Sequence, residues 1–286
     1  MSSQFLFWLA LALKLALTAG IVVTASFVTE RAGPLIGALV VTLPVTVWPA
    51  YVFLSLDHDA PFVALSVVSG LAMNAVSGIF MLIYIVLAQR RSLIVSLGIA
   101  VASWLIVAIL AHGIVWTPTL AILTNVAVYT ICILLTSRFR HVSVPRTVRQ
   151  WYDLPLRTLL VCALMGTVLL ISNVVGPVAT GFVAVFPIST CSTMLILHPR
   201  LGGPCTAAVI ANGLFGLAGI GAALTVTYFA IPTLGITIAL ALLLAVPIAW
   251  NLTVWIVRMR VLSYTYGIGF TWRLPRSPVP SSDVRR

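Results

Sequence analysis

Long apolar runs, separated by short polar or proline-containing turns, dominate this 286-residue chain. Each run has about 20 mostly apolar residues, which is the length of a helix that crosses a bilayer. The strands of a membrane barrel would be half as long and would alternate in polarity. The pattern therefore predicts an all-α polytopic membrane protein with nine transmembrane helices. The predicted spans are residues 5–28, 34–56, 61–88, 93–111, 116–136, 156–175, 177–197, 204–230 and 233–257.

The composition agrees with this class, because 61% of the residues are apolar, only 7% are charged and the mean hydropathy is +1.17. A soluble globule needs more polar surface than that. The four cysteines are isolated, without the spacing of a metal or redox site, and the chain has no P-loop, HExxH or GxSxG motif. We expect neither enzymatic activity nor a bound cofactor or metal, and no nucleic-acid partner.

A block of the chain occurs twice, 143 positions apart and without a gap. Between residues 33–78 and 176–221, 11 of 46 positions are identical, and six of these are glycine or proline. Glycine and proline fix the shape of the backbone, so the match indicates a duplicated structural unit. The predicted divisions are a four-helix repeat over 1–111, a linker helix and basic loop over 112–147, a second repeat over 148–262 and a disordered basic tail over 263–286.

All 15 arginines fall on one side of the nine-span topology, in alternate connections and in the C-terminal tail. Cationic connections stay in the cytoplasm, so we expect the N-terminus outside and the C-terminus inside. Merging residues 93–136 into one span would put arginines on both faces. The net charge of +11 is therefore mainly a topology signal, with a secondary attraction to anionic lipid of the inner leaflet.

The topology makes the two repeats inverted, because four crossings return the chain to its starting side and the linker helix then carries it across once more. Inverted repeats place a substrate site near the bilayer midplane, where the repeats meet. Exchange of conformations between the repeats then converts an outward-open state into an inward-open one. This geometry favours alternating access.

The second span of each repeat contains a proline about a dozen residues after a Gly-Pro start, at Pro44 and Pro187. Each proline removes a backbone hydrogen bond near the midplane. Hydroxyl side chains surround both positions, among them Thr46, Ser189 and Thr190. Freed carbonyls and hydroxyls at mid-membrane are what a discontinuous helix offers to a substrate or ion, although a proline kink repaired by neighbouring hydroxyls has the same pattern.

Five further residues are candidates to line a polar path. Asn74 and Asn212 are amides within the third spans, which are otherwise rich in small residues suited to close helix packing. Asn125 and Tyr129 of the linker span are similar candidates. Lys14 lies within the first span and either faces a cavity, attracting an anion, or extends to the outer headgroups.

No span contains a carboxylate at mid-membrane depth, where proton- or sodium-driven carriers place one.

We expect Asp57 and His58 to lie in water outside the membrane, and Asp59, two residues before Pro61, to cap the third span.

Each repeat resembles small four-helix bacterial inner-membrane proteins of the GlpM-like kind, through its Gly-Pro opening with a glycine soon after it, the later proline and a glycine-bearing third span. The resemblance covers 33 to about 110 and 176 to about 257, and it implies an architecture and a bacterial inner-membrane location, with no assigned activity.

We predict a secondary transporter or facilitator for a small neutral or anionic solute, with a site formed by Pro44, Thr46, Pro187, Ser189 and Thr190 and lined by Asn74, Asn212 and Lys14. Two alternatives are a non-transporting membrane scaffold or assembly factor and, with less support, an enzyme for lipid-linked substrates. A water-filled cavity between Pro44 and Pro187 would favour transport, and a dry, packed interior would favour a scaffold. A homo-oligomer is compatible with each hypothesis.

Overall fold

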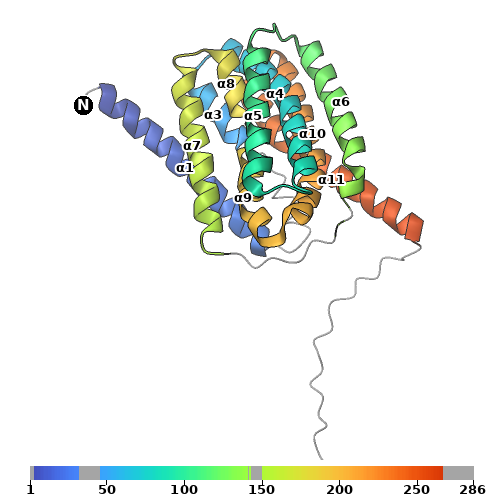
Figure 1. The fold of residues 1–286 in the computed structure, drawn as a ribbon. Coiled ribbons are helices and arrows are strands. Elements are labelled where there is room, and N and C mark those ends of the chain that lie inside the picture. The colour runs from blue at the N-terminus through green and yellow to red at the C-terminus, as the bar shows by residue number, and fades with distance from the viewer. Residues whose placement is uncertain (1–2, 32–45, 141, 143–149, 267–286) are drawn as a thin grey trace, which may run out of the picture.

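The computed structural model of the protein describes residues 3–31, 46–140, 142 and 150–266, and all of its regular elements there are helices (Figure 1). The elements are α1 (Ser3–Arg31), α3 (Val47–Asp57), α4 (Ala60–Leu87), α5 (Leu93–His112), α6 (Pro118–Leu135), η1 (Ser137–Phe139), α7 (Asp153–Ser172), α8 (Pro177–Ala184), α9 (Ile188–Leu201), α10 (Gly203–Leu234) and α11 (Ile236–Tyr266). Eight segments of this part are long and apolar enough to cross a membrane, with α8 and α9 together forming one of them.

The eight segments agree with eight of the nine predicted spans. The remaining prediction, over 34–56, lies partly outside the described residues, and α3 covers its C-terminal half. The region 93–136 consists of two helices, because α5 ends at His112 and α6 begins at Pro118. The prediction of two separate helices over 93–136, which the arginine pattern favoured, is therefore confirmed.

Local sequence signals explain where the central helices begin. The Asp59 carboxylate accepts a hydrogen bond of 3.1 Å from the backbone N–H of Phe62, so the predicted cap of α4 is confirmed. Thr117 caps α6 in the same way, directly before Pro118. Gly235 lies between α10 and α11 and has a φ of 83°, a left-handed conformation that glycine adopts without strain. This residue therefore ends α10.

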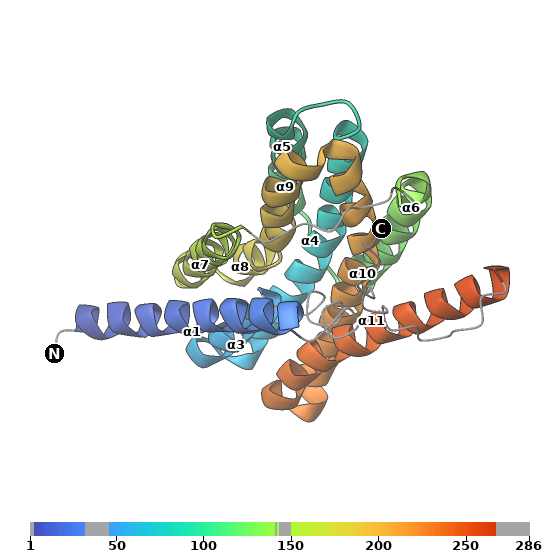
Figure 2. The same ribbon diagram turned by 90° about the horizontal axis from the view of Figure 1, so that it is seen from below.

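Helix α4 lies at the centre of the bundle and packs against α5, α6, α8 and α10 (Figure 1). In its most apolar window 72% of the residues are buried, against 11% in α1 and in α11. Figure 2 shows α1 and α11 extending from the central helices in opposite directions, with α1 beside α7 and α11 beside α10. The central helices can thus hold a polar site, whereas α1 and α11 offer their apolar side chains to the bilayer.

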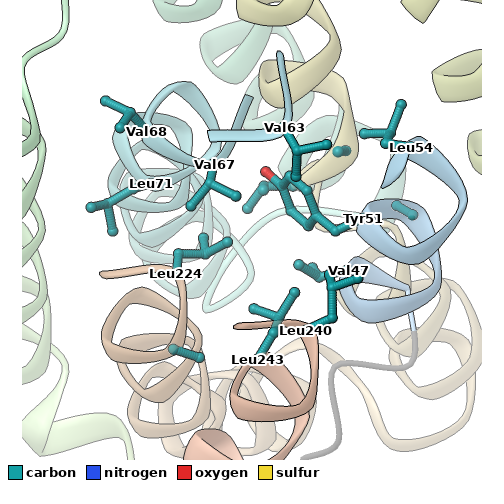
Figure 3. Close-up of a cluster of buried hydrophobic side chains, with 14 of the residues drawn as sticks. Val47, Tyr51, Leu54, Val63, Val67, Val68, Leu71, Leu224, Leu240 and Leu243 are labelled. Atoms are coloured by element: carbon teal, nitrogen blue, oxygen red, sulfur yellow. The ribbon is translucent and has the colours of Figure 1, made fainter. Parts of the chain in front are cut away.

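A buried cluster joins α3, α4, α10 and α11 (Figure 3). Tyr51 lies at its centre, between Val63 and Val67 of α4 and Leu240 and Leu243 of α11. The Tyr51 hydroxyl donates to the backbone oxygen of Ser66 over 3.0 Å. This cluster holds α3, which is the described half of the predicted span over 34–56, against α4 and α11.

Glycines bring α4 and α8 into backbone contact. A Cβ atom at Gly181 of α8 would overlap the backbone oxygen of Ser66, and one at Gly70 of α4 would overlap the Tyr51 hydroxyl. Small residues in the third span therefore serve close packing here, as the sequence indicated.

Candidate functional site

Of the two alternatives left open for Pro187, a discontinuous helix and a repaired kink, the structure has the discontinuous helix. Helix α8 ends at Ala184 and α9 begins at Ile188, and the residues between them leave helical geometry, with Pro187 at φ −78° and ψ 53°. Pro187 has no N–H to donate, and the N–H of Ile188 is directed to the oxygen of Phe186 over 2.7 Å instead. The predicted span over 177–197 is thus discontinuous, and Val185 and Pro187 at its break are buried.

Side chains of α4 and α5 enclose this break. Ser77 of α4, fully buried, has its hydroxyl 3.4 Å from the oxygen of Val185 and 3.2 Å from the oxygen of Met73. The indole N–H of Trp104 donates to the same hydroxyl over 3.3 Å, and the Trp104 ring meets the Phe186 ring edge-on at 4.8 Å. The hydroxyl that supports the break therefore comes from a neighbouring helix.

One turn before Ser77, Asn74 forms a second polar cluster, between α4, α6 and α10. Its amide nitrogen donates to Asn125 Oδ1 over 2.9 Å and to the oxygen of Leu217 over 3.1 Å. The amide nitrogen of Asn125 donates to the oxygens of Leu71 and Ala121. Each buried amide thus has partners in other helices, as a polar group in a membrane requires.

The Asn74 side-chain oxygen is buried without a hydrogen-bond partner among the described residues. An unsatisfied buried acceptor costs about 1–3 kcal/mol, so this oxygen is suited to accept a donor from a water or a small polar molecule. The Tyr129 hydroxyl lies nearby and donates to the backbone oxygen of Asn74 over 2.8 Å. Together, Asn125, Asn74, Ser77 and the Val185 oxygen form what we term the polar belt.

Two glycines that match at the 143-position offset make room for α6. A Cβ atom at Gly78 of α4 would come within 3.3 Å of Val128 and Tyr129, and one at Gly221 of α10 within 2.9 Å of Asn125 Oδ1. The helix between the two predicted repeats thus docks on equivalent positions of α4 and α10.

Lys14 has a partner in the described structure. Its ammonium group lies 2.5 and 2.6 Å from the two carboxylate oxygens of Asp57, and the two side chains are 17% and 31% exposed. Asp57, predicted to lie in water, therefore compensates the only lysine of the chain. The pair joins α1 to the C-terminal end of α3.

A second ion pair joins α7 to α9. The Arg200 guanidinium donates to both carboxylate oxygens of Asp153, over 2.9 Å to Oδ2, and its side chain is 17% exposed. The guanidinium also lies over the Tyr152 ring at 5.0 Å. Asp57 and Arg200 are separated by the same 143 positions as the matched glycines and prolines, whereas their partners Lys14 and Asp153 are not.

The other predicted site residues are spread over the molecule. Thr46, 9% exposed, precedes α3, while Ser189 is exposed and Thr190 half-buried in the first turn of α9. Asn212 donates to the oxygens of Ala208 and Arg140, away from the polar belt. The last predicted site residue, Pro44, lies outside the described residues.

Two residues at the break, Ser77 of the polar belt and its donor Trp104, were not singled out for a site from the sequence. Ser77 resembled the other small packing residues of its span, and Trp104 had no signal beyond its aromatic side chain. A serine three residues after a buried asparagine lies on nearly the same helix face, which is the one local signal available.

Comparison with known proteins adds no relative: no family model, no curated protein and no solved structure matches this chain, so the GlpM-like resemblance stays a prediction.

Proposed function

We propose that this protein is a secondary transporter or facilitator built from two inverted four-helix repeats. The observation that carries the proposal is the contact between Asn74 and Leu217, which are 143 positions apart. Residues near a two-fold axis contact their own equivalents, so this contact is what an axis between α4 and α10 would produce. Helices α4 and α10, and likewise α5 and α11, also begin 143 positions apart.

The break between α8 and α9 supports a substrate site beside this axis. In transporters with inverted repeats, interrupted helices hold the substrate near the midplane. The polar belt comprises Ser77 at the break and, one turn away on α4, the Asn74–Asn125 pair, and it supplies amide, hydroxyl and carbonyl groups without a charge. The Asp57 carboxylate neutralises the positive charge of Lys14, so this lysine does not favour an anion. The proposed solute is therefore small, neutral and polar.

The two ion pairs fit an alternating mechanism. Under the predicted topology, Lys14–Asp57 lies at the outer face and Asp153–Arg200 at the inner face. Opening a path between α1 and α3 would separate the first pair, and opening one between α7 and α9 would separate the second. Each pair would then stabilise closure of its own face.

Solute uptake into reconstituted vesicles tests the proposal. Asn74→Leu removes one of the two side-chain amides of the polar belt and should reduce the initial rate of uptake at least ten-fold. Asn251→Leu is the matched control, because the Asn251 amide donates only to Pro247 of its own helix, over 2.7 Å. A broad screen in which no solute moves, or equal rates in the Asn74→Leu variant and the wild type, would overturn the proposal.

A topology test accompanies it. A reporter fused after Arg286 should be cytoplasmic and one fused at Met1 external, since all 15 arginines then face the cytoplasm. A reporter pair on the same side would remove the inversion of the repeats and with it the alternating mechanism.

The close packing of α4 favours a second candidate, a membrane scaffold or assembly factor. A Cβ atom at Gly203 would overlap the backbone oxygen of Ala88, and α8 meets α4 with similar closeness at Gly181. Cysteine labelling separates the candidates. In a variant without the four native cysteines, Ser77→Cys should react with a water-soluble thiol reagent in a transporter, whereas protection in every condition would support the scaffold.

A further inference from the structure

The amide donors of the polar belt are all engaged within the protein. Asn74 donates one amide hydrogen to Asn125 Oδ1 over 2.9 Å and the other to the oxygen of Leu217 over 3.1 Å. Asn125 donates both of its own to the oxygens of Leu71 and Ala121. A primary amide has two hydrogens to donate, so neither side chain has one left for another molecule.

The hydroxyl of the belt is engaged in the same way. Ser77 Oγ lies 3.2 Å from the oxygen of Met73 and 3.4 Å from the oxygen of Val185, and it accepts the indole N–H of Trp104 over 3.3 Å. A hydroxyl has a single hydrogen, and here two backbone oxygens share it. The side chains of the belt therefore have no donor to offer to a ligand.

The free hydrogen-bonding group of the belt is an acceptor. Asn74 is 1% exposed, and no described residue donates to its Oδ1. The neighbours identify this atom as the oxygen, because turning the Asn74 amide over would set its oxygen against the oxygens of Asn125 and Leu217. Turning Asn125 as well would set its oxygen against those of Leu71 and Ala121. A molecule that binds here must therefore bring the hydrogen.

Charge and space limit that molecule. Asn74 lies halfway along α4 (Ala60–Leu87), where a charge inside the membrane is costly, and the belt has no carboxylate to compensate a cation. The helices also meet closely around the belt. A Cβ atom at Gly221 would come within 3.0 Å of the Asn74 amide nitrogen, and one at Gly70 within 2.9 Å of the Val185 side chain. The molecule must therefore be neutral and small.

We infer that Asn74 Oδ1 accepts a hydrogen bond from a neutral N–H or O–H donor of the size of water or urea, and that the belt selects solutes that donate over solutes that only accept. This inference names the substrate class of the proposed transporter and in that respect rests on the proposed function. Water and a solute share the donor chemistry, so the experiment has an arm for each.

Solid-state NMR of the full-length protein in lipid vesicles tests the inference at the atom concerned. The chain has five asparagines, which are isotopically labelled at Cγ, and the Asn74 resonance is the one lost in Asn74→Leu. If that variant does not fold, substitutions of Asn173, Asn212 and Asn251 leave only Asn74 and Asn125 to distinguish. The probes are urea, acetamide and acetone, which have nearly the same shape but progressively fewer N–H groups.

Urea and acetamide should shift the Asn74 resonance saturably, and acetone should leave it in place. Asn125 is the matched control and should shift less, because its oxygen already accepts a hydrogen from Asn74. In the water arm, magnetisation transfer from water to Cγ should be stronger for Asn74 than for Asn125, and urea should reduce it.

Three results would overturn the inference: no saturable shift with urea or acetamide, an equal shift with acetone, or transfer from water that neither amide changes, which would identify a structural water. Failure of the proposed function gives a different result. In that case no solute enters reconstituted vesicles, while the shifts of Asn74 with urea and acetamide remain.

Discussion

The ion pair between Lys14 and Asp57 should contribute measurably to stability, although the two residues are 43 positions apart in the sequence. Both carboxylate oxygens lie within 2.6 Å of the ammonium group, and the side chains are 17% and 31% exposed. Removing one partner of a fully buried pair costs about 3–5 kcal/mol, and an exposed pair contributes about 0.2–1 kcal/mol. For this intermediate exposure we expect Lys14→Met and Asp57→Asn each to lower the free energy of unfolding by about 2 kcal/mol.

The double variant decides whether the pair is the cause. Each single variant leaves one charge without its partner, whereas the double variant removes both charges, so its loss should be smaller than the sum by about 1–2 kcal/mol. Free energies of unfolding in mixed detergent micelles give this coupling. Asp59→Asn is the control, because Asp59 caps α4 and should show no coupling to Lys14. Additivity of Lys14→Met and Asp57→Asn to within about 0.5 kcal/mol would refute the reasoning.

Other predictions concern the central packing. Gly181→Leu should destabilise the protein by about 3 kcal/mol or more, because its side chain would enter the backbone of α4, whereas Gly98→Leu, with open space around its Cβ position, should change the free energy of unfolding by less than about 1 kcal/mol. Asn125→Leu leaves the oxygens of its former partners without the amide and should cost about 1–3 kcal/mol in the same micelle assay; no loss would contradict the hydrogen bonds of the belt. Tyr129→Phe removes one hydroxyl and should cost about 0.5–1.5 kcal/mol, less than Asn125→Leu; the reverse order would argue against the stated geometry.

Helix boundaries could be predicted because the signals for them are local. Asp59 and Pro61 mark the start of α4, and Gly113 after His112 together with Thr117 before Pro118 separates α5 from α6. Pro187 was recognisable as a candidate interruption because it has no N–H, but the sequence does not separate it from Pro247, which lies inside α11.

The partners of polar residues could not be predicted, because tertiary packing decides them. Asn74 and Asn125 were each recognisable as amides that need a partner, but the sequence does not indicate that they bind one another across 51 positions. Asp57 looked like a residue in water because the sequence alone does not reveal that α1 passes beside the end of α3. Ser77 appeared to be a packing residue until the break at Val185 was found next to it.

Helix α6, which docks on Gly78 and Gly221, has a consequence for the proposed alternation. It has no second copy, so the exchange of conformations between two repeats would leave α6 against different surroundings before and after. The contacts of this helix would then add to the difference in free energy between the outward- and inward-facing states. Substitutions at positions such as Val128 should therefore shift the resting population of the two states while leaving the chemistry of solute binding unchanged, which makes the unrepeated helix a place where a preferred resting state is encoded.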